Sequence, residues 1–105
     1  MNTKPLESSI ERKAVKLAKE LKIRTTKLNV TNNRGIPDRI FWIPGGRPLL
    51  AEFKRPGKEP TKLQARTIKW LDDLGYCVGC WSNYEAFETE LTILVMNSKL
   101  MRTRF

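Results

Sequence analysis

The chain alternates between segments with helical and with strand-like spacing of apolar residues. Three segments predict amphipathic helices, because their apolar residues recur every three to four positions: residues 8–22, 61–74 and 83–99. Four segments rich in β-branched and aromatic residues predict strands: residues 23–30, 39–43, 47–54 and 76–81. The order helix, three strands, helix, strand, helix predicts an α/β domain in which helices flank a central mixed sheet.

Capping and turn residues indicate where these elements begin and end. Thr61 is the predicted N-cap of the second helix, Gly75 follows its last turn, and Asn83 can begin the third helix. The turn PGG joins the second and third strands in a hairpin. Four residues of the second helix are predicted to face inward: Leu63, Ile68, Leu71 and Leu74. We expect a single domain over residues 1–105, with its core at about 7–97 and a loose basic tail at 98–105.

Composition adds a strong positive charge to this picture. The 105 residues carry 20 Lys and Arg against 11 Asp and Glu, and the net charge of +9 is spread along the chain. Such an excess favours a polyanionic partner, and nucleic acid fits best. No apolar run approaches the roughly 20 residues that span a bilayer, and no apolar segment near the N-terminus precedes a small-residue cleavage site. We therefore expect a soluble, intracellular protein of the cytoplasm.

Cysteine and histidine usage narrows the chemistry. Cys77 and Cys80 form a C-x-x-C, but the chain has no His and no second cysteine pair to complete a structural zinc site. The motif lies in a predicted strand, where residues three apart face opposite sides, so we expect the cysteines to pack in the core. Without His, catalysis must use carboxylates, Lys, hydroxyls, thiols or a metal held by oxygen.

Charged residues interrupt the predicted hairpin. Glu52 and Lys54 are two positions apart, so they project from one face of their strand, and Asp38 begins the strand that pairs with it. A lone Glu–Lys pair would be an ordinary surface ion pair, but two converging carboxylates repel unless a cation lies between them. Oxygen ligands suit Mg²⁺ or Mn²⁺. In a basic chain this set predicts a phosphodiester hydrolase in which the metal activates water and Lys54 orients it or stabilises charge at phosphorus.

The residues Pro37-Asp38 and Glu52-Phe53-Lys54 have the spacing of the PD-(D/E)xK nucleases. The stretches GIPDR, PGGR, AEFKRPGKEPTKLQ and LGY resemble, in order and spacing, the stand-alone VRR-NUC domains of phages and bacteria, over roughly residues 7–87. The resemblance implies a restriction-endonuclease-like core and a divalent-metal-dependent endonuclease that acts on branched DNA. For stand-alone members it implies a homodimer, with the Holliday (four-way) junction as leading substrate.

The resemblance also implies roles for single residues. Phe53 would give its backbone carbonyl to the metal, alongside Asp38 and Glu52. A Glu on the first helix would complete the outer shell, and we choose Glu11 over Glu7, although Glu11 could instead close a capping box with the serine three residues before it. Gln64 matches a glutamine near the active site, where its alternative is an ordinary polar helix residue. The expected catalytic set is Glu11, Asp38, Glu52, Lys54 and Gln64.

Basic residues around this site are expected to contact DNA phosphates: Lys27, Arg34, Arg39, Lys58 and Lys62. Nothing resembles a recognition helix or a stacking platform, so we expect recognition of DNA shape. The three tryptophans, Trp42, Trp70 and Trp81, are expected in the core or in subunit contacts.

The sequence leaves alternatives for the oligomeric state and for the substrate. A four-way junction needs paired cuts, which a C₂ dimer would supply, and the apolar run Leu91–Met96 can serve either a dimer interface or the core. The other readings are a flap-cutting or restriction-type nuclease and a basic DNA-binding protein of nuclease fold, in which Asp38 and Glu52 are structural.

Overall fold

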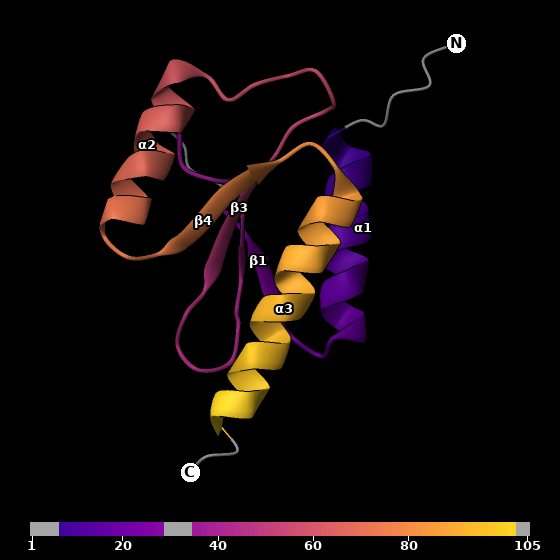
Figure 1. Ribbon diagram of the computed structural model, residues 1–105. Helices are drawn as coiled ribbons and strands as arrows, with labels where there is room; N and C mark the ends of the chain where they lie inside the picture. The colour runs from indigo at the N-terminus through magenta and orange to yellow at the C-terminus, as the bar shows by residue number, and fades with distance from the viewer. Residues whose placement is uncertain (1–6, 29–34, 103–105) are drawn as a thin grey trace.

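The computed structural model describes residues 7–28 and 35–102. The elements follow in the order α1 (Glu7–Glu20), β1 (Thr25–Lys27), β2 (Arg39–Phe41), β3 (Leu49–Phe53), α2 (Lys62–Asp73), β4 (Cys77–Trp81) and α3 (Tyr84–Arg102). The strands form one sheet in the order β1-β2-β3-β4 (Figure 1). β3 and β4 are parallel and joined by the α2 crossover, whereas the other neighbours are antiparallel. The predicted element order and mixed sheet are confirmed.

The core lies between the sheet and two of the helices. α1 and α3 pack together on one face of the sheet, and α2 lies on the other (Figure 1). Phe41 of β2 and Phe53 of β3 meet Phe87 of α3, with ring centroids 5.0 and 5.2 Å from the Phe87 ring. Ile10 and Leu17 close this cluster from α1. The opposite sheet face, which carries Ile40, Leu50 and Glu52, is therefore left to α2.

Helix α2 is far less buried than its apolar pattern predicts. Of the four residues expected to face inward, only Leu71 is buried; Ile68 is half-buried, and Leu63 and Leu74 are 46% and 57% exposed. The reason is its position, because α2 packs mainly against the edge strand β4, on the face away from the aromatic core. The prediction that all four residues face inward is wrong.

The ends of α2 and α3 follow the predicted local signals. Thr61 is the N-cap of α2, and Gly75 follows its last turn with a φ of 95°, which glycine adopts without strain. At the start of α3, Asn83 Oδ1 accepts a hydrogen bond of 3.0 Å from the N–H of Ala86. α3 continues to Arg102, so the expected loose tail is wrong for residues 98–102, while residues 103–105 lie outside the described part. No helix within residues 7–28 and 35–102 is long and apolar enough to cross a membrane.

Helix α1 ends at Glu20, shortly before the predicted end. The N–H of Ile23 donates to the Ala18 carbonyl at 3.0 Å, and Lys22 between them adopts a φ of 61°. This left-handed conformation favours glycine, and a lysine there costs about 1–2 kcal/mol. The turn delivers the chain to β1, which is shorter than the predicted strand over 23–30; residues 29 and 30 lie outside the described part.

Candidate active site

The hairpin of β2 and β3 brings the two predicted metal ligands together. Arg39 pairs with Ala51 in the antiparallel register, so the next residue pair sets Asp38 opposite Glu52 on the same sheet face. The side chain of Asp38 also accepts a hydrogen bond at Oδ2 from the N–H of Phe53, at 3.1 Å. This bond joins the residue before β2 to the end of β3 and keeps the first carboxylate beside the second.

Glu52 is a buried carboxylate with an unused oxygen. The residue is 4% exposed, its Oε2 accepts a hydrogen bond of 3.1 Å from Gln64 Nε2, and its Oε1 has no partner within the described residues. The pKa of Glu52 is raised to about 7, first by burial and then by the charge of Asp38, while Lys54 lowers it. A buried acceptor without a partner is unfavourable, and a bound cation would satisfy it.

The N-terminus of α2 holds Glu52 through Gln64. Thr61 and Gln64 form a capping box: Thr61 Oγ1 accepts from the Gln64 N–H at 3.1 Å, and Gln64 Oε1 accepts from the Thr61 N–H at 2.9 Å. The other end of the same side-chain amide, Nε2, is thereby directed to Glu52. Gln64, which the family resemblance placed near the active site, thus donates to Glu52, and Thr61 positions it.

Gly35 sets the approach of the Asp38 segment to α2. Its φ is 74°, and a Cβ added to it would lie 2.7 Å from the Leu63 carbonyl oxygen and 2.9 Å from the Gln64 Cα. Only glycine allows both this backbone conformation and this contact. The GIPD stretch therefore runs against the first turn of α2, which explains why its glycine belongs to the motif. Gly35 is part of the GIPDR stretch that was singled out in the sequence, but no role was predicted for it.

Lys54 lies between two carboxylates. Its Nζ is 3.7 Å from Glu52 Oε2 and 4.0 Å from Glu7 Oε1, and its side chain is only 14% exposed. Glu7, in the first turn of α1, is the first-helix carboxylate at the site.

Glu11, chosen from the sequence, lies elsewhere. Its Oε2 is 2.7 Å from Arg39 Nε and 3.4 Å from Lys27 Nζ. Because α1 already includes Glu7, Ser8 lies within its first turn, and a Ser8–Glu11 capping box is not formed. Glu11 instead ties α1 to strands β1 and β2, one helical turn after Glu7. The expectation that Glu11 faces the site is wrong in position, because the rotation of α1 on the sheet directs Glu7 there.

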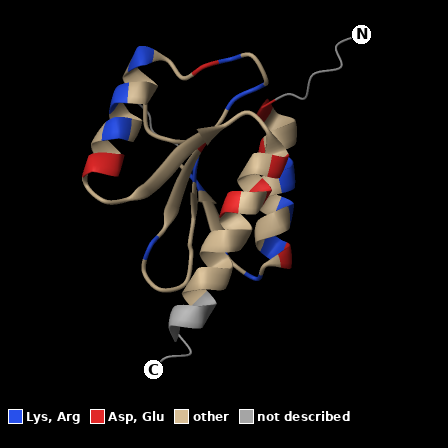
Figure 2. Cartoon of the chain, in the orientation of Figure 1, with Lys and Arg blue, Asp and Glu red and all other residues tan. Residues whose placement is uncertain are grey.

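The predicted DNA contacts divide into two groups. Arg39 is paired with Glu11 and its side chain is 16% exposed, and Lys27 is drawn to the same carboxylate. Lys58 and Lys62 are exposed, on the loop before α2 and on its first turn. Figure 2 shows Lys and Arg along this loop and α2, and Asp and Glu toward the first turns of α3. Arg34 lies outside the described residues.

The donor set suits a hard divalent cation. Asp38 and Glu52 supply oxygen ligands on one sheet face, and the unpartnered Glu52 Oε1 needs a cation or a proton. Within the described part of the chain no three His, Cys, Asp or Glu side chains are grouped as a complete metal site. Two carboxylates would leave the remaining positions to a backbone carbonyl, water and substrate, which is the usual arrangement for Mg²⁺.

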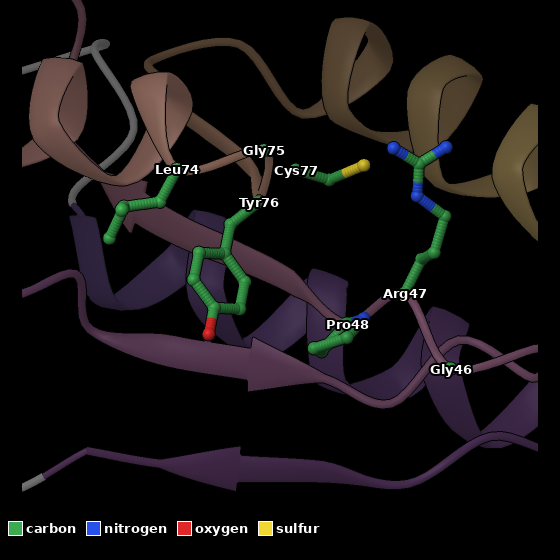
Figure 3. Close-up of a pocket in the computed structure, with 7 residues that line it drawn as sticks. All are labelled: Gly46, Arg47, Pro48, Leu74, Gly75, Tyr76 and Cys77. Atoms are coloured by element: carbon green, nitrogen blue, oxygen red, sulfur yellow. The ribbon is translucent and has the colours of Figure 1, made fainter.

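A pocket of about 140 Å³ lies at the opposite end of β3, under the C-terminus of α2. In Figure 3 Arg47, Pro48, Leu74, Tyr76 and Cys77 surround it. None of the predicted catalytic residues lines this pocket. The candidate active site is therefore the charged cluster at the end of β3, not this pocket.

Comparison with known proteins gives the family. The chain is 35% identical over 72 residues to "Putative nuclease p44" of Acyrthosiphon pisum secondary endosymbiont phage 1, an alignment that covers 69% of this chain and 77% of that protein. Its fold matches a solved "VRR_NUC domain" with a TM-score of 0.74 at 20% identity, over 82% of this chain and 94% of the other. A second structure, "VRR_NUC domain protein", matches with a TM-score of 0.70 at 16% identity, over 90% and 91%. No family model matches the sequence. With this relative, this fold and the Asp38/Glu52/Lys54 cluster, the chain belongs to the VRR-NUC family of nucleases.

Proposed function

We propose that this chain is a divalent-metal-dependent DNA endonuclease that cuts branched DNA, with the four-way junction as its leading substrate. The nuclease class is supported by the phage relative and by the family. The observation that carries the metal dependence is Glu52: a buried carboxylate opposite Asp38, with an unpartnered oxygen and a pKa raised to about 7. An ionised carboxylate that is buried beside a second carboxylate is unfavourable by itself, and a bound cation makes it favourable.

Each residue of the candidate site would have a separate role. Asp38, Glu52 and the backbone carbonyl of Phe53 would hold Mg²⁺ or Mn²⁺. When bound, the ion supplies a Lewis acid for the phosphoryl oxygens and lowers the pKa of water. Lys54, held between Glu52 and Glu7, would orient the attacking water or donate to the scissile phosphate. Gln64 keeps Glu52 oriented through its hydrogen bond.

Glu7, rather than Glu11, would be the first-helix glutamate in the outer shell of the metal site. It is the first-helix carboxylate beside Lys54, and half of its side chain is exposed, so it can accept from water or from Lys54. Glu11 is occupied by Arg39 and Lys27. We therefore assign Glu11 to the fold and Glu7 to the site.

DNA would approach over the exposed loop and helix beside the site. Lys58 and Lys62 remain the best predicted phosphate contacts, and the exposed Arg55 and Arg66 extend the same surface. Arg39 is a poor candidate, because contact with a phosphate would remove it from Glu11. Contacts to phosphates read no base sequence. Because they release counterions, the affinity for DNA is expected to fall steeply as the salt concentration rises.

Paired cutting of a junction would need a homodimer. The support lies in exposed apolar side chains on α2, because the predicted run on α3 is divided between the core residues Leu91 and Val95 and the exposed Ile93 and Met96. Leu63, Trp70 and Leu74 form a stripe along α2, each about half exposed. Two copies with the same +9 charge repel each other, so contact through an uncharged stripe is favoured.

The decisive experiment is a cleavage assay on linear, flap and four-way-junction DNA of equal length, with Mg²⁺, Mn²⁺ or EDTA. We expect metal-dependent cuts, fastest on the junction and placed symmetrically. Cleavage in EDTA would contradict the metal role, and preference for the flap would move the substrate to flaps. Binding without cleavage of any substrate in either metal would favour the non-catalytic reading.

A further inference from the structure

One thiol shares the sheet face of the two carboxylates. In the parallel pairing of β3 with β4, Glu52 is the partner of Cys80. Asp38, the residue before β2, continues the register opposite Glu52 on the other side. Asp38, Glu52 and Cys80 therefore form one row on the sheet face that carries α2. Cα partners on adjacent strands lie about 5 Å apart, so the Cys80 side chain stands next to that of Glu52.

Cys77 provides the contrast within the same motif. It is three positions earlier on β4, so its side chain belongs to the opposite face, where it packs against the aromatic core. Both cysteines are free and half-buried. The expectation of core packing is therefore met by Cys77 only.

The surroundings of Cys80 are those of the active site. Burial raises the pKa of the Cys80 thiol, and Glu52 is the next-largest cause, followed by Lys54, which lowers it, and then by Asp38 and Glu7, which raise it. Asp38, Lys54 and Glu7 are also the charged residues that act on the pKa of Glu52, whose Oε1 has no partner within the described residues. The Glu52 carboxylate and the Cys80 thiol thus occupy paired positions on one sheet face, and together they offer one hard and one soft donor.

We propose that Cys80 and Glu52 form a binding site for a thiophilic divalent cation such as Cd²⁺ or Zn²⁺, at the edge of the proposed Mg²⁺ site and in competition with it. This rests on the proposed function insofar as Glu52 is shared between the two ions. Mg²⁺ prefers oxygen and leaves the thiol protonated, whereas a soft ion is bound by the thiolate and releases the thiol proton to solvent. Cys80 and Glu52 would supply two ligands, and water would supply the others, since no third His, Cys, Asp or Glu is grouped with them within the described residues.

The direct test is spectroscopic and needs no DNA. The full-length protein, kept reduced by a non-thiol reductant, is titrated with Cd²⁺ while sulfur-to-metal charge-transfer absorption is recorded. We expect one Cys80-dependent band in the wild type and in Cys77→Ser, and its loss in Cys80→Ser and Cys80→Ala. Glu52→Gln should retain a band but require about tenfold or more Cd²⁺. A band that persists in Cys80→Ser, depends on Cys77 or is absent from the folded wild type overturns the proposal.

Competition with Mg²⁺ separates this inference from the nuclease activity. Each variant is measured against its own cleavage rate in Mg²⁺, and the Cd²⁺ concentration for half inhibition is compared. It should rise about tenfold or more in Cys80→Ser and stay unchanged in Cys77→Ser. Equal inhibition of the two variants would overturn the competition. A Cys80-dependent band in a protein that cleaves no DNA would sustain the cation site while the proposed function fails.

Discussion

Gln64 connects the cap of α2 to Glu52, the buried carboxylate of the candidate active site, with one side-chain amide. Its Oε1 accepts from the N–H of Thr61 at 2.9 Å, and its Nε2 donates to Glu52 Oε2 at 3.1 Å. Each bond uses a different end of the amide, so the orientation of the group is determined by both partners. The start of α2 and the buried carboxylate are thereby held in one arrangement.

Gln64→Glu should separate these two tasks. A glutamate at this position can still accept from Thr61, as in common capping boxes, but it cannot donate to Glu52 and adds a charge beside it. We expect a strong loss of cleavage with α2 intact by circular dichroism. Thr61→Ala is the matched control: it should lower the free energy of unfolding by about 1 kcal/mol and retain most cleavage. A Gln64→Glu variant as active as the wild type would exclude the positioning role.

Glu52 should make the metal-free protein less stable as pH rises. Its pKa is about 7 in the folded chain against an ordinary value of 4.5, so between these values the folded state holds a proton that the unfolded chain has released. The free energy of unfolding should therefore fall across this pH range, by roughly 1–3 kcal/mol. Glu52→Gln should be nearly flat there and more stable than the wild type at pH 8. Chemical denaturation from pH 4 to 9 in EDTA measures both.

Metal should offset this loss in the wild type alone. At pH 8, Mg²⁺ or Mn²⁺ is expected to raise the Tm of the wild type and to have little effect on Glu52→Gln, because a ligand stabilises only the state that binds it. Asp38→Asn should also lose the Tm shift and the cleavage. Equal shifts in all three proteins would place the ion elsewhere.

Glu7→Gln and Glu11→Gln test the reassignment on α1. Glu7→Gln should reduce cleavage with little change in stability, because its side chain is half exposed and only 4.0 Å from Lys54. Glu11→Gln should do the reverse: it leaves the largely buried Arg39 without its carboxylate, which costs a few kcal/mol. Cleavage rates at saturating Mg²⁺ and urea denaturation midpoints separate the two effects. The opposite result would return the site role to Glu11.

The proposed dimer predicts a species of twice the 12.2 kDa monomer mass at micromolar concentration. Trp70→Lys on α2 should convert it to monomer, because a charge in an apolar interface is unfavourable. Ile93→Lys on α3 is the control, since Ile93 is similarly exposed, at 49% against 56%. Light scattering after gel filtration distinguishes the masses. If only Ile93→Lys dissociates the protein, the interface lies on α3 instead.

The sequence by itself determined the order of the helices and strands and the grouping of Asp38, Glu52 and Lys54 in the candidate site. Helix and strand periods are local, and the hairpin between residues 39 and 53 is short, so the pairing of Asp38 with Glu52 followed from a turn and an alternation pattern alone. Lys54, two residues after Glu52, was included by the same alternation. Thr61 and Asn83 could be predicted as caps because a cap depends on residues within one turn.

Only the tertiary structure decided which neighbours those residues meet. Glu7 and Glu11 are one turn apart on α1, so their periodicity is the same, and only the rotation of the helix on the sheet distinguishes Lys54 from Arg39 as a partner. The exposure of Leu63 and Leu74 depends on how much of the sheet α2 covers. The parallel pairing across the α2 crossover aligns Cys80 with Glu52, 28 residues away in sequence. These are long-range packing relationships, on which a local pattern carries no information.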